Sequence, residues 1–491
     1  MGLDRLDLLL VAVYLAGITA FGISFRRRQR SLRDYFLADR NVPWWAIALS
    51  IVAAETSTLT IISIPGLAYD TNFTFLQVVL GYLVARVIIS LIFIPQYFRG
   101  EMFTAYQLID RRFGGRLRSL TAGLFLATRA AAEGVRVFAV SIVVGIALGG
   151  MLAGFSDFGR DLAAIAIVTA LTLIYTFEGG LTAVIWTDVV QMAIYISGTL
   201  VGFLTLVHRV PGGWNTIHSM AASAGKFQVF DFSPSFFTTY TFWSGIIGGT
   251  FLTTASHGTD QLMVQRLLAA RNERQSKTAL LTSGLVILLQ FALFLAVGVG
   301  LWAFYRLMPP ATAFTRSDRI FPDFIVTQMP HGISGLLIAA ILAAAMSNLS
   351  AALNSLSSSS IVDFYLRRYP DAPEKRRMLV SRVSTIAWGL VLFALAILSR
   401  RGGRVVEVGL SLASVAYGAM LGVFLLGVLT RRANERGAIL GMAVGFALEL
   451  YIWLATKVPW TWYVMIGTSV TFAVGYAASL VMTGPAERAH G

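Results

Sequence analysis

The feature that most restricts the fold of this chain is a succession of apolar blocks, each about twenty residues long. A helix of that length crosses the hydrocarbon core of a bilayer, which is about 30 Å thick. Hydrophobic residues make up 56% of the 491 residues and charged residues 13%, whereas a soluble chain carries about 25% charged residues. The sequence therefore predicts an all-α integral membrane protein and excludes a cytosolic enzyme, a nucleic-acid-binding protein and a disordered chain.

The apolar blocks predict about thirteen transmembrane helices in a single transmembrane domain over residues 1–491. Lys and Arg are more than twice as abundant in the loops on one side of these helices as on the other. The positive-inside rule then places the N-terminus outside and the C-terminus in the cytoplasm, and it accounts for the net charge of +14. The expected location is the cell membrane, which is the inner membrane in a Gram-negative cell. The predicted spans are 4–25, 44–66, 73–97, 119–150, 161–176, 183–207, 237–256, 279–306, 331–361, 380–399, 405–429, 437–456 and 460–482.

Two of these spans contain residues that interrupt a helix. Span 44–66 carries a polar run at mid-membrane, Glu55 to Thr58, and span 237–256 carries three glycines followed by hydroxyl residues. Lipid cannot satisfy broken backbone, so such a segment lines a cavity or packs against protein. The alternative is that the small residues only allow close packing of helices.

Each interrupted span opens a set of five spans, and because five is odd, the second set enters the membrane from the opposite side. This arrangement predicts an inverted repeat with a binding site near the bilayer midplane. The expected organisation is a leading helix with a cytoplasmic loop (1–43), a first repeat (44–207), a second repeat (237–429) and two trailing helices (437–482).

Span 331–361 contains side-chain oxygens suited to a monovalent cation. Ser347 and Asn348 follow Ala344 at helical spacing. Two side-chain oxygens and a carbonyl oxygen freed by a helix irregularity form a hard-oxygen site of the kind that hard cations prefer. Its other ligands must come from another broken helix, and span 44–66 provides one.

Six ionisable side chains lie within predicted spans, and each costs about 2.5–3.5 kcal/mol at a helix centre unless it has a partner or a function. Glu133 shares one helix face with Arg129 and Arg136, at spacings of four and three residues. Arg129 has two interpretations, a bidentate receptor for a carboxylate or a member of an internal ion-pair network. The other four residues, apart from Arg129 and Asp188, are assigned to that ion-pair network: Glu55, Arg86, Glu133 and Arg136.

Several motifs resemble those of the sodium:solute symporter family, which includes proline permease and the sodium–glucose and sialic acid cotransporters. The run GGLTAVIWTDVVQ at 179–191 is similar to the family's signature, and TDQLMVQRLLAA at 259–270 is similar to a second family run. The segment AAMS at 344–347 and the loop RRANERGAILG at 431–441 also fit. The resemblance covers nearly the whole chain. It implies the LeuT-type five-plus-five inverted repeat and secondary active transport driven by Na⁺.

The resemblance also implies where sodium binds. The family usually has Ser or Thr at the position of Asn348, and Ala351 replaces a hydroxyl ligand of a second sodium site that some members have. Asp188, with Ser350, is assigned to that second site or to a sodium release path, and an ion pair between Asp188 and Arg86 is the alternative. The main sodium site is expected on backbone oxygens of Ala53 and Thr56 and on Ala344, Ser347 and Asn348.

For the substrate, the resemblance points to a small organic anion or zwitterion, a carboxylate or an amino acid. Arg129 resembles the position at which sialic acid transporters hold the carboxylate of their substrate. Sugar carriers have aromatic residues where this chain has Ser256 and His257, so a neutral hexose lacks a stacking platform there. The expected substrate contacts are Ser57, Thr60, Gln77, Arg129, Thr253 and Ser256.

Two other transport functions stay open on the sequence. One is a proton-coupled symporter with Glu55, Asp188 or His257 as the titrating group, and the other is a sodium-coupled carrier of a neutral solute such as a sugar or vitamin. An enzyme is not expected, because the five histidines are scattered and the chain has no cysteine. The expected partners are the solute, Na⁺ and the lipid bilayer, with no nucleic acid and no obligate protein partner.

Overall fold

The regular secondary structure of the described part of the chain is helical, apart from one isolated β-bridge between Val42 and Ala270. The glycines at 179–180, which open the first family motif, lie outside the described residues. The structure, a computed structural model, describes residues 3–24, 38–99, 105–148, 151–152, 154–175, 181–310, 313–400 and 404–482.

The polar run of span 44–66 is a break between two helices, α3 (Trp44–Glu55) and α4 (Thr58–Asp70). The two helices are bent by 63° relative to each other. The α3 helix ends because Thr56 leaves the helical region, with a φ of −87° and a ψ of 73°, although its N–H still bonds to the carbonyl of Val52. Ser57 is extended and occupies the N-cap position of α4.

The second interruption lies beyond its predicted position. Two of the three glycines of span 237–256, Gly245 and Gly248, lie in a π-helical turn, η3 (Ser244–Gly248), that continues directly into α11 (Gly249–Gly258). The backbone breaks only at residues 259–260 and resumes as α12 (Gln261–Leu268). A Cβ on Gly249 would lie 2.3 Å from the carbonyl oxygen of Val78, so the glycines allow close packing against the helix that carries this residue. Their interpretation as the break is therefore wrong.

Most other predicted spans coincide with one long helix each. Among the described residues, eight helices are long and apolar enough to cross a membrane, or nine when α3 and α4 count as one span. The number thirteen therefore stays a prediction. The long helices are α1 (Arg5–Ser24), α5 (Leu76–Tyr97), α7 (Gly115–Ala147), α8 (Asp157–Tyr175), α9 (Leu181–Arg209), α13 (Glu273–Leu307), α15 (Ile333–Ser359), α17 (Glu374–Ser399), α18 (Val405–Leu429), α19 (Glu435–Ala455) and α20 (Tyr463–Val481).

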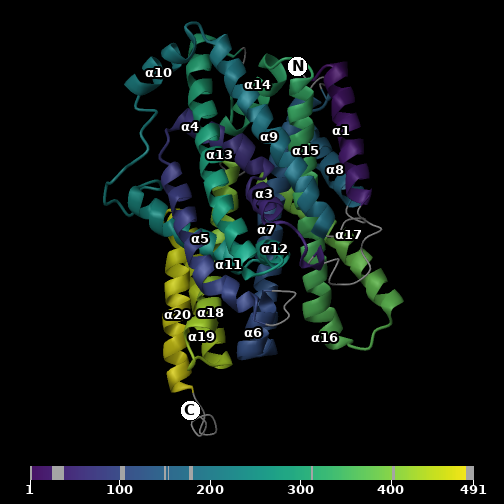
Figure 1. Cartoon of the computed structure of the whole chain (residues 1–491), viewed down its shortest axis with the longest axis vertical. Helices are drawn as coiled ribbons and strands as arrows, with labels where there is room; N and C mark the ends of the chain where they lie inside the picture. The colour runs from purple at the N-terminus through teal and green to yellow at the C-terminus, as the bar shows by residue number, and fades with distance from the viewer. Residues whose placement is uncertain are drawn as a thin grey trace.

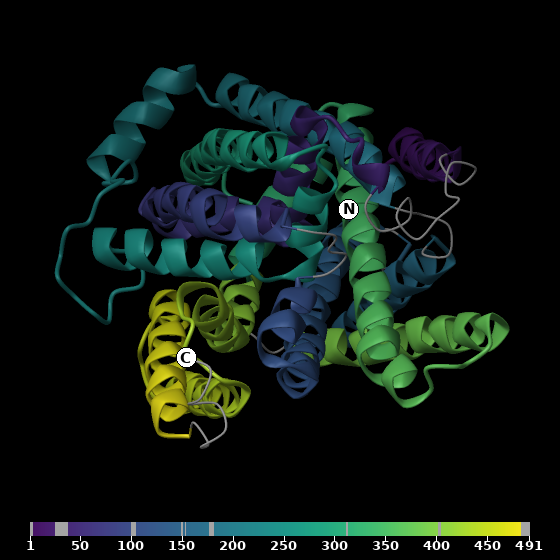
Figure 2. The same ribbon diagram turned by 60° about the horizontal axis from the view of Figure 1, so that its bottom comes forward.

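Short helices occupy the connections, among them α6 (Tyr106–Phe113), α10 (Gly213–Ser223) and α14 (Ile320–Gln328). In Figure 1, α3, α7 and α12 lie in the middle of the bundle, with α1 along one side. The helices α18 to α20 lie along the opposite side, and the rotated view of Figure 2 keeps this separation. The breaks are enclosed because α13 packs against α3, α4 and α12, and α15 contacts α4 and α12.

A buried carboxyl group joins the last three helices. Glu449 of α19 is fully buried, and its Oε2 accepts a hydrogen bond from the N–H of Ala419 in α18 at 3.2 Å. A Cβ on Gly418 of α18 or on Gly467 of α20 would lie 2.1 Å from Glu449 Oε1. The two glycines thus make room for this side chain, and α18, α19 and α20 pack tightly around it.

Candidate functional site

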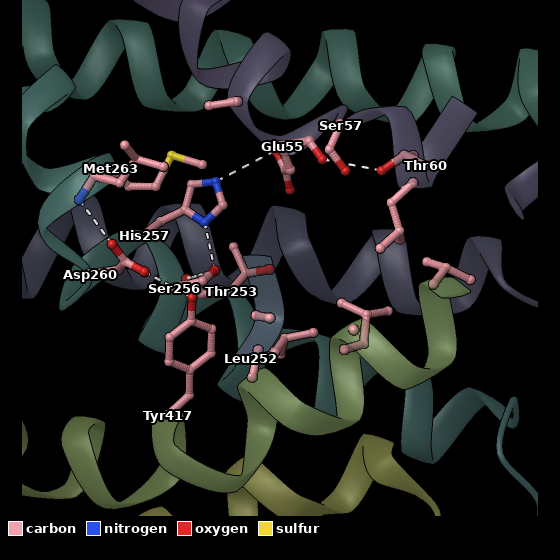
Figure 3. Close-up of a pocket in the computed structure, with 18 of the residues that line it drawn as sticks. Glu55, Ser57, Thr60, Leu252, Thr253, Ser256, His257, Asp260, Met263 and Tyr417 are labelled. Carbon is pink, nitrogen blue, oxygen red and sulfur yellow. Dashed lines mark hydrogen bonds and ion pairs between the residues drawn. The ribbon is translucent and has the colours of Figure 1, made fainter. Parts of the chain in front are cut away.

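A cavity of about 120 Å³ lies between the two helix breaks. Figure 3 shows side chains from the α3–α4 break on one side of it, Tyr417 of α18 on the opposite side, and Ser256, His257 and Asp260 between them. Five of the six residues predicted to contact the substrate line this cavity, namely Ser57, Thr60, Arg129, Thr253 and Ser256. The fold therefore brings together side chains from α4, α7 and α11 that are far apart in sequence.

The sixth residue, Gln77, is fully buried in α5 and holds the loop that precedes η3. Its Nε2 donates to the carbonyls of Thr74 at 3.0 Å and Tyr240 at 3.3 Å. Its Oε1 accepts the N–H of Asp231 at 3.0 Å. Gln77 is not among the described residues that line the cavity.

Arg129 contributes a buried guanidinium group to the cavity wall, with a side chain that is 7% exposed. Its Nη1 donates to Asp260 Oδ2 at 3.3 Å, and its Nη2 lies 2.9 Å from Glu133 Oε1. Glu133 also pairs with Arg136. Within the described residues Nε of Arg129 makes no hydrogen bond, and the contact of Nη2 with Glu133 is an ion pair without hydrogen-bond geometry.

A second charged group faces the cavity at the end of α3. Glu55 pairs with Arg86 of α5, which also donates to Ser283 Oγ at 3.2 Å. His257 Nε2 lies 3.5 Å from Glu55 Oε2, and His257 Nδ1 is 2.8 Å from Ser256 Oγ (Figure 3). The two helix breaks therefore contact each other through a carboxylate and an imidazole.

The predicted sodium ligands lie on elements that meet. Ala53 is in the last turn of α3, where carbonyl oxygens lack the N–H partners of a continuing helix, and Thr56 is in the break. The first residue of α4 contacts α15, because Thr58 Oγ1 donates to the carbonyl of Ile341 at 3.3 Å. Asn348 lines a cavity of about 10 Å³ together with Ser57 and Thr58, a volume close to that of one water molecule.

The other predicted ligands on α15 are Ala344, which is buried, and Ser347, whose side chain lies outside the described structure. Thr56 has partners of its own, since its Oγ1 donates to Gln290 Oε1 at 3.1 Å and its carbonyl accepts from Tyr195 at 3.4 Å. Glu133 and Arg136 also line the cavity of about 10 Å³, so the ion pairs around Arg129 extend from the larger cavity to this one.

Asp188 of α9 lies in a buried cluster between three helices. Its Oδ2 accepts from Ser50 Oγ of α3 at 2.6 Å and from Arg266 Nη2 of α12 at 3.1 Å. The alternative that paired Asp188 with Arg86 is wrong, since Arg86 pairs with Glu55. Ser350 is buried on α15.

Sequence reasoning missed three side chains of this region, Asp260, Arg266 and Tyr417. Asp260 and Arg266 belong to the run 259–270, which had been used only as a family signature. The signal that could have indicated a role for Asp260 is its charge in a segment between two apolar spans. The predicted span 237–256 ends before this residue, so the span did not include it.

A buried cavity between two interrupted helices is the architecture of a secondary transporter. The chain matches the model of the sodium:solute symporter family over residues 35–445. The sodium/sialic acid symporter of Aliivibrio fischeri is 32% identical over 96% of this chain and 92% of its own length. The sodium-coupled monocarboxylate transporter 1 of Mus musculus is 27% identical over 87% and 69% of the two chains.

A solved Na⁺-coupled sialic acid symporter, in a substrate-bound outward-open state, is similar with a TM-score of 0.85 at 28% identity over 98% of both chains. The chain belongs to the sodium:solute symporter family, and the resemblance stated from its motifs is confirmed. It is a multi-pass membrane transporter that couples solute entry to sodium.

Proposed function

We propose that this symporter imports a small organic acid together with Na⁺, and that the acid is a carboxylated sugar of the sialic acid type. The observation that carries the proposal is the buried guanidinium group of Arg129 in the cavity wall. Its Nε makes no hydrogen bond to the described residues, and its Nη2 lies 2.9 Å from Glu133 Oε1 in an ion pair without hydrogen-bond geometry. Nε and Nη2 form the planar edge that a carboxylate binds through both of its oxygens, so the substrate would share Nη2 with Glu133.

The rest of the cavity suits a sugar skeleton. Phe75 and Phe291 stack with ring centroids 5.6 Å apart, and both line the cavity. They supply an apolar surface for the carbon ring of a ligand. The hydroxyl groups of Ser57, Thr60 and Thr253 line the same cavity and can exchange hydrogen bonds with the hydroxyl groups of a sugar. A fatty acid would leave these polar groups without partners.

Sodium is proposed to bind where the α3–α4 break meets α15, on Ala53, Thr56, Ala344, Ser347 and Asn348. Support comes from the contact between Thr58 and Ile341 and from the cavity of about 10 Å³ beside Asn348. An ion there would join the first and second halves of a five-plus-five inverted repeat. Asp188 and Ser350 are proposed for the path by which sodium leaves, and the ion pair with Arg266 must open for this role.

The proposed mechanism is alternating access, with the N-terminus outside and the C-terminus in the cytoplasm of the cell membrane. Sodium and the acid bind between the two breaks, and rocking of one half against the other exposes both to the cytoplasm. The membrane potential adds about 2.3 kcal/mol per net charge per 100 mV. A monoanion that enters with one sodium moves no net charge, so the sodium gradient alone would drive it.

Uptake into proteoliposomes tests the proposal. N-acetylneuraminate uptake is expected to require an inward sodium gradient and to fall to background when choline replaces sodium. Arg129→Lys retains a charge but cannot form the bidentate pair, so the KM is expected to rise at least about ten-fold. Uptake that does not change in choline would overturn sodium coupling, and an unchanged KM in Arg129→Lys would overturn the carboxylate site.

A second candidate, proton coupling on the same fold, is favoured by the distance of 3.5 Å between His257 Nε2 and Glu55 Oε2. An imidazole and a carboxylate can each hold a proton, and both face the cavity. An outwardly acid pH jump without sodium discriminates between the two ions, because only a proton-coupled carrier accumulates solute under that condition. A neutral sugar or vitamin stays the alternative substrate, and it would bind equally well to Arg129→Gln.

A further inference from the structure

The charged side chains around the cavity balance one another before any substrate enters. Those that line it, together with their ion-pair partners, are three carboxylates and three guanidinium groups among the described residues, and the imidazole of His257 also lines the cavity. The set consists of Glu55, Glu133 and Asp260 with Arg86, Arg129 and Arg136.

Asp260 lies at the second helix break and pairs with Arg129, and both of its carboxylate oxygens accept hydrogen bonds. Its Oδ1 accepts the N–H of Leu262 at 2.9 Å, so it caps the N-terminus of α12. Its Oδ2 accepts from the hydroxyl of Tyr417 at 2.9 Å and from Arg129 Nη1 at 3.3 Å. The residue is 2% exposed, so water does not screen this charge.

The balance has a consequence for an anionic substrate. A carboxylate that binds Arg129 brings a third acidic group to a guanidinium already beside Asp260 and Glu133. The site then carries one uncompensated negative charge in a low-dielectric environment, which is costly. A sodium ion restores the balance. Arg136 lines both cavities and its ion-pair partner Glu133 lines the smaller one, so this charge acts on the proposed sodium position beside Asn348.

We propose that Asp260 makes binding of the carboxylate dependent on sodium, because it removes the surplus positive charge with which Arg129 would otherwise bind the anion alone. Asp260 is thus a coupling residue that need not touch the substrate. Tyr417 positions it, and the cap on α12 fixes it to the second helix break. The inference rests on the proposed function in one respect, the carboxylate nature of the substrate.

Equilibrium binding of N-acetylneuraminate to the purified full chain, measured with sodium or with choline at about pH 8, tests this inference. We expect the wild-type affinity to fall at least about ten-fold in choline. In Asp260→Asn the amide oxygen can still accept from Leu262 N–H and the amide nitrogen can donate to the hydroxyl oxygen of Tyr417, but the charge is lost. Its affinity in choline is expected to rise at least about ten-fold above that of the wild type, which reduces the effect of sodium to about three-fold or less.

The controls separate charge from structure. Asp260→Glu keeps the charge and Tyr417→Phe removes only a hydrogen bond, so both are expected to retain the sodium effect. Glu133→Gln removes the other acidic partner of Arg129 and is expected to behave as Asp260→Asn, which keeps the test decisive if one variant does not fold. The neutral methyl ester of the probe is expected to bind with little dependence on sodium.

An Asp260→Asn protein that folds, binds the acid and keeps the wild-type ratio of affinities in sodium and choline would overturn the role of Asp260 alone. If Asp260→Asn does not fold, a wild-type ratio in Glu133→Gln has the same meaning. Wild-type protein that binds no carboxylate probe in sodium would instead overturn the proposed function. The two failures therefore give different results in the same experiment.

Discussion

Glu55 and Arg86 indicate how single residues allow charge inside this membrane protein. Arg86 is 1% exposed and pairs with Glu55, and its other donors bond to Ser283 and to the carbonyl of Tyr82. The loss of one partner of a buried pair leaves the other charge without compensation, which is more harmful than the loss of both.

Glu55→Gln is therefore expected to destabilise the protein by about 3–5 kcal/mol, because Arg86 then stays buried without a counter-charge. The double variant Glu55→Gln/Arg86→Gln should recover part of this loss. Thermal unfolding in detergent, followed by tryptophan fluorescence, measures both. A double variant that is less stable than the single one would contradict the interpretation of the pair as mutually neutralising.

Substitution of Asn348 tests the proposed sodium site. Asn348→Ala removes a side-chain oxygen beside the cavity that Asn348 shares with Ser57, so the sodium concentration for half-maximal uptake is expected to rise about ten-fold, or about 1.4 kcal/mol. Asn348→Ser restores a hydroxyl oxygen and should stay near the wild type. A sodium dependence unaffected by Asn348→Ala would remove this residue from the ligand set.

At the scale of elements, the first helix break could be predicted from sequence and the second could not. A carboxylate and three hydroxyl residues inside span 44–66 are incompatible with lipid, so they predict a helix break. Glycines have two uses in membrane helices, and sequence does not distinguish a break from close packing. The side chains of the cavity were predictable where the motifs carried them, whereas Asp260 and Tyr417 depend on a tertiary meeting of α12 and α18.

The contact of α5 with η3 and α11 gives a prediction about packing. A Cβ on Gly81 would lie 2.6 Å from the carbonyl oxygen of Gly245, so Gly81→Ala is expected to cost about 1–3 kcal/mol and to lower the melting temperature. Gly145→Ala is the matched control, since nothing lies within 4 Å of its added Cβ and alanine favours a helix. Equal melting temperatures for the two variants would contradict the close approach.

The junction of α1 with the start of α15 gives a prediction about pH. His331, which precedes α15, contacts Asp7 Oδ2 at 3.1 Å and Asp4 Oδ2 at 3.2 Å. The hydrogen bond to Asp7 and the charge of Asp4 raise the pKa of His331 above its ordinary value of 6.5. A raised pKa means that the imidazolium favours the folded state, so this contribution is complete below the ordinary value and is lost as the pH rises through the folded pKa.

Melting temperatures of the wild type and of His331→Gln are expected to converge as the pH increases across that range. If the difference in melting temperature between the wild type and His331→Gln grows with pH, the effect has the opposite sign, and the stabilising contact of His331 with Asp4 and Asp7 is contradicted.

At the scale of the whole molecule, orientation in the bilayer is a prediction from charge alone. The chain has no cysteine, so a single introduced cysteine reports only its own position. Ser233→Cys, in the exposed segment between α10 and η3, is expected to react with a membrane-impermeant maleimide added to intact cells. Arg432→Cys, between α18 and α19, should react only after permeabilisation. The reverse pattern would invert the proposed topology.

The carboxyl group of Glu449, packed between Gly418 and Gly467, has a mechanical consequence. Because α18 cannot slide past α19 or α20 without displacing that side chain, the three helices must move together. Any movement of α18 that takes Tyr417 away from the cavity therefore also moves two lipid-facing helices. Turnover should then slow in thick or viscous bilayers, because lipid resists the movement of three helices more than the movement of one.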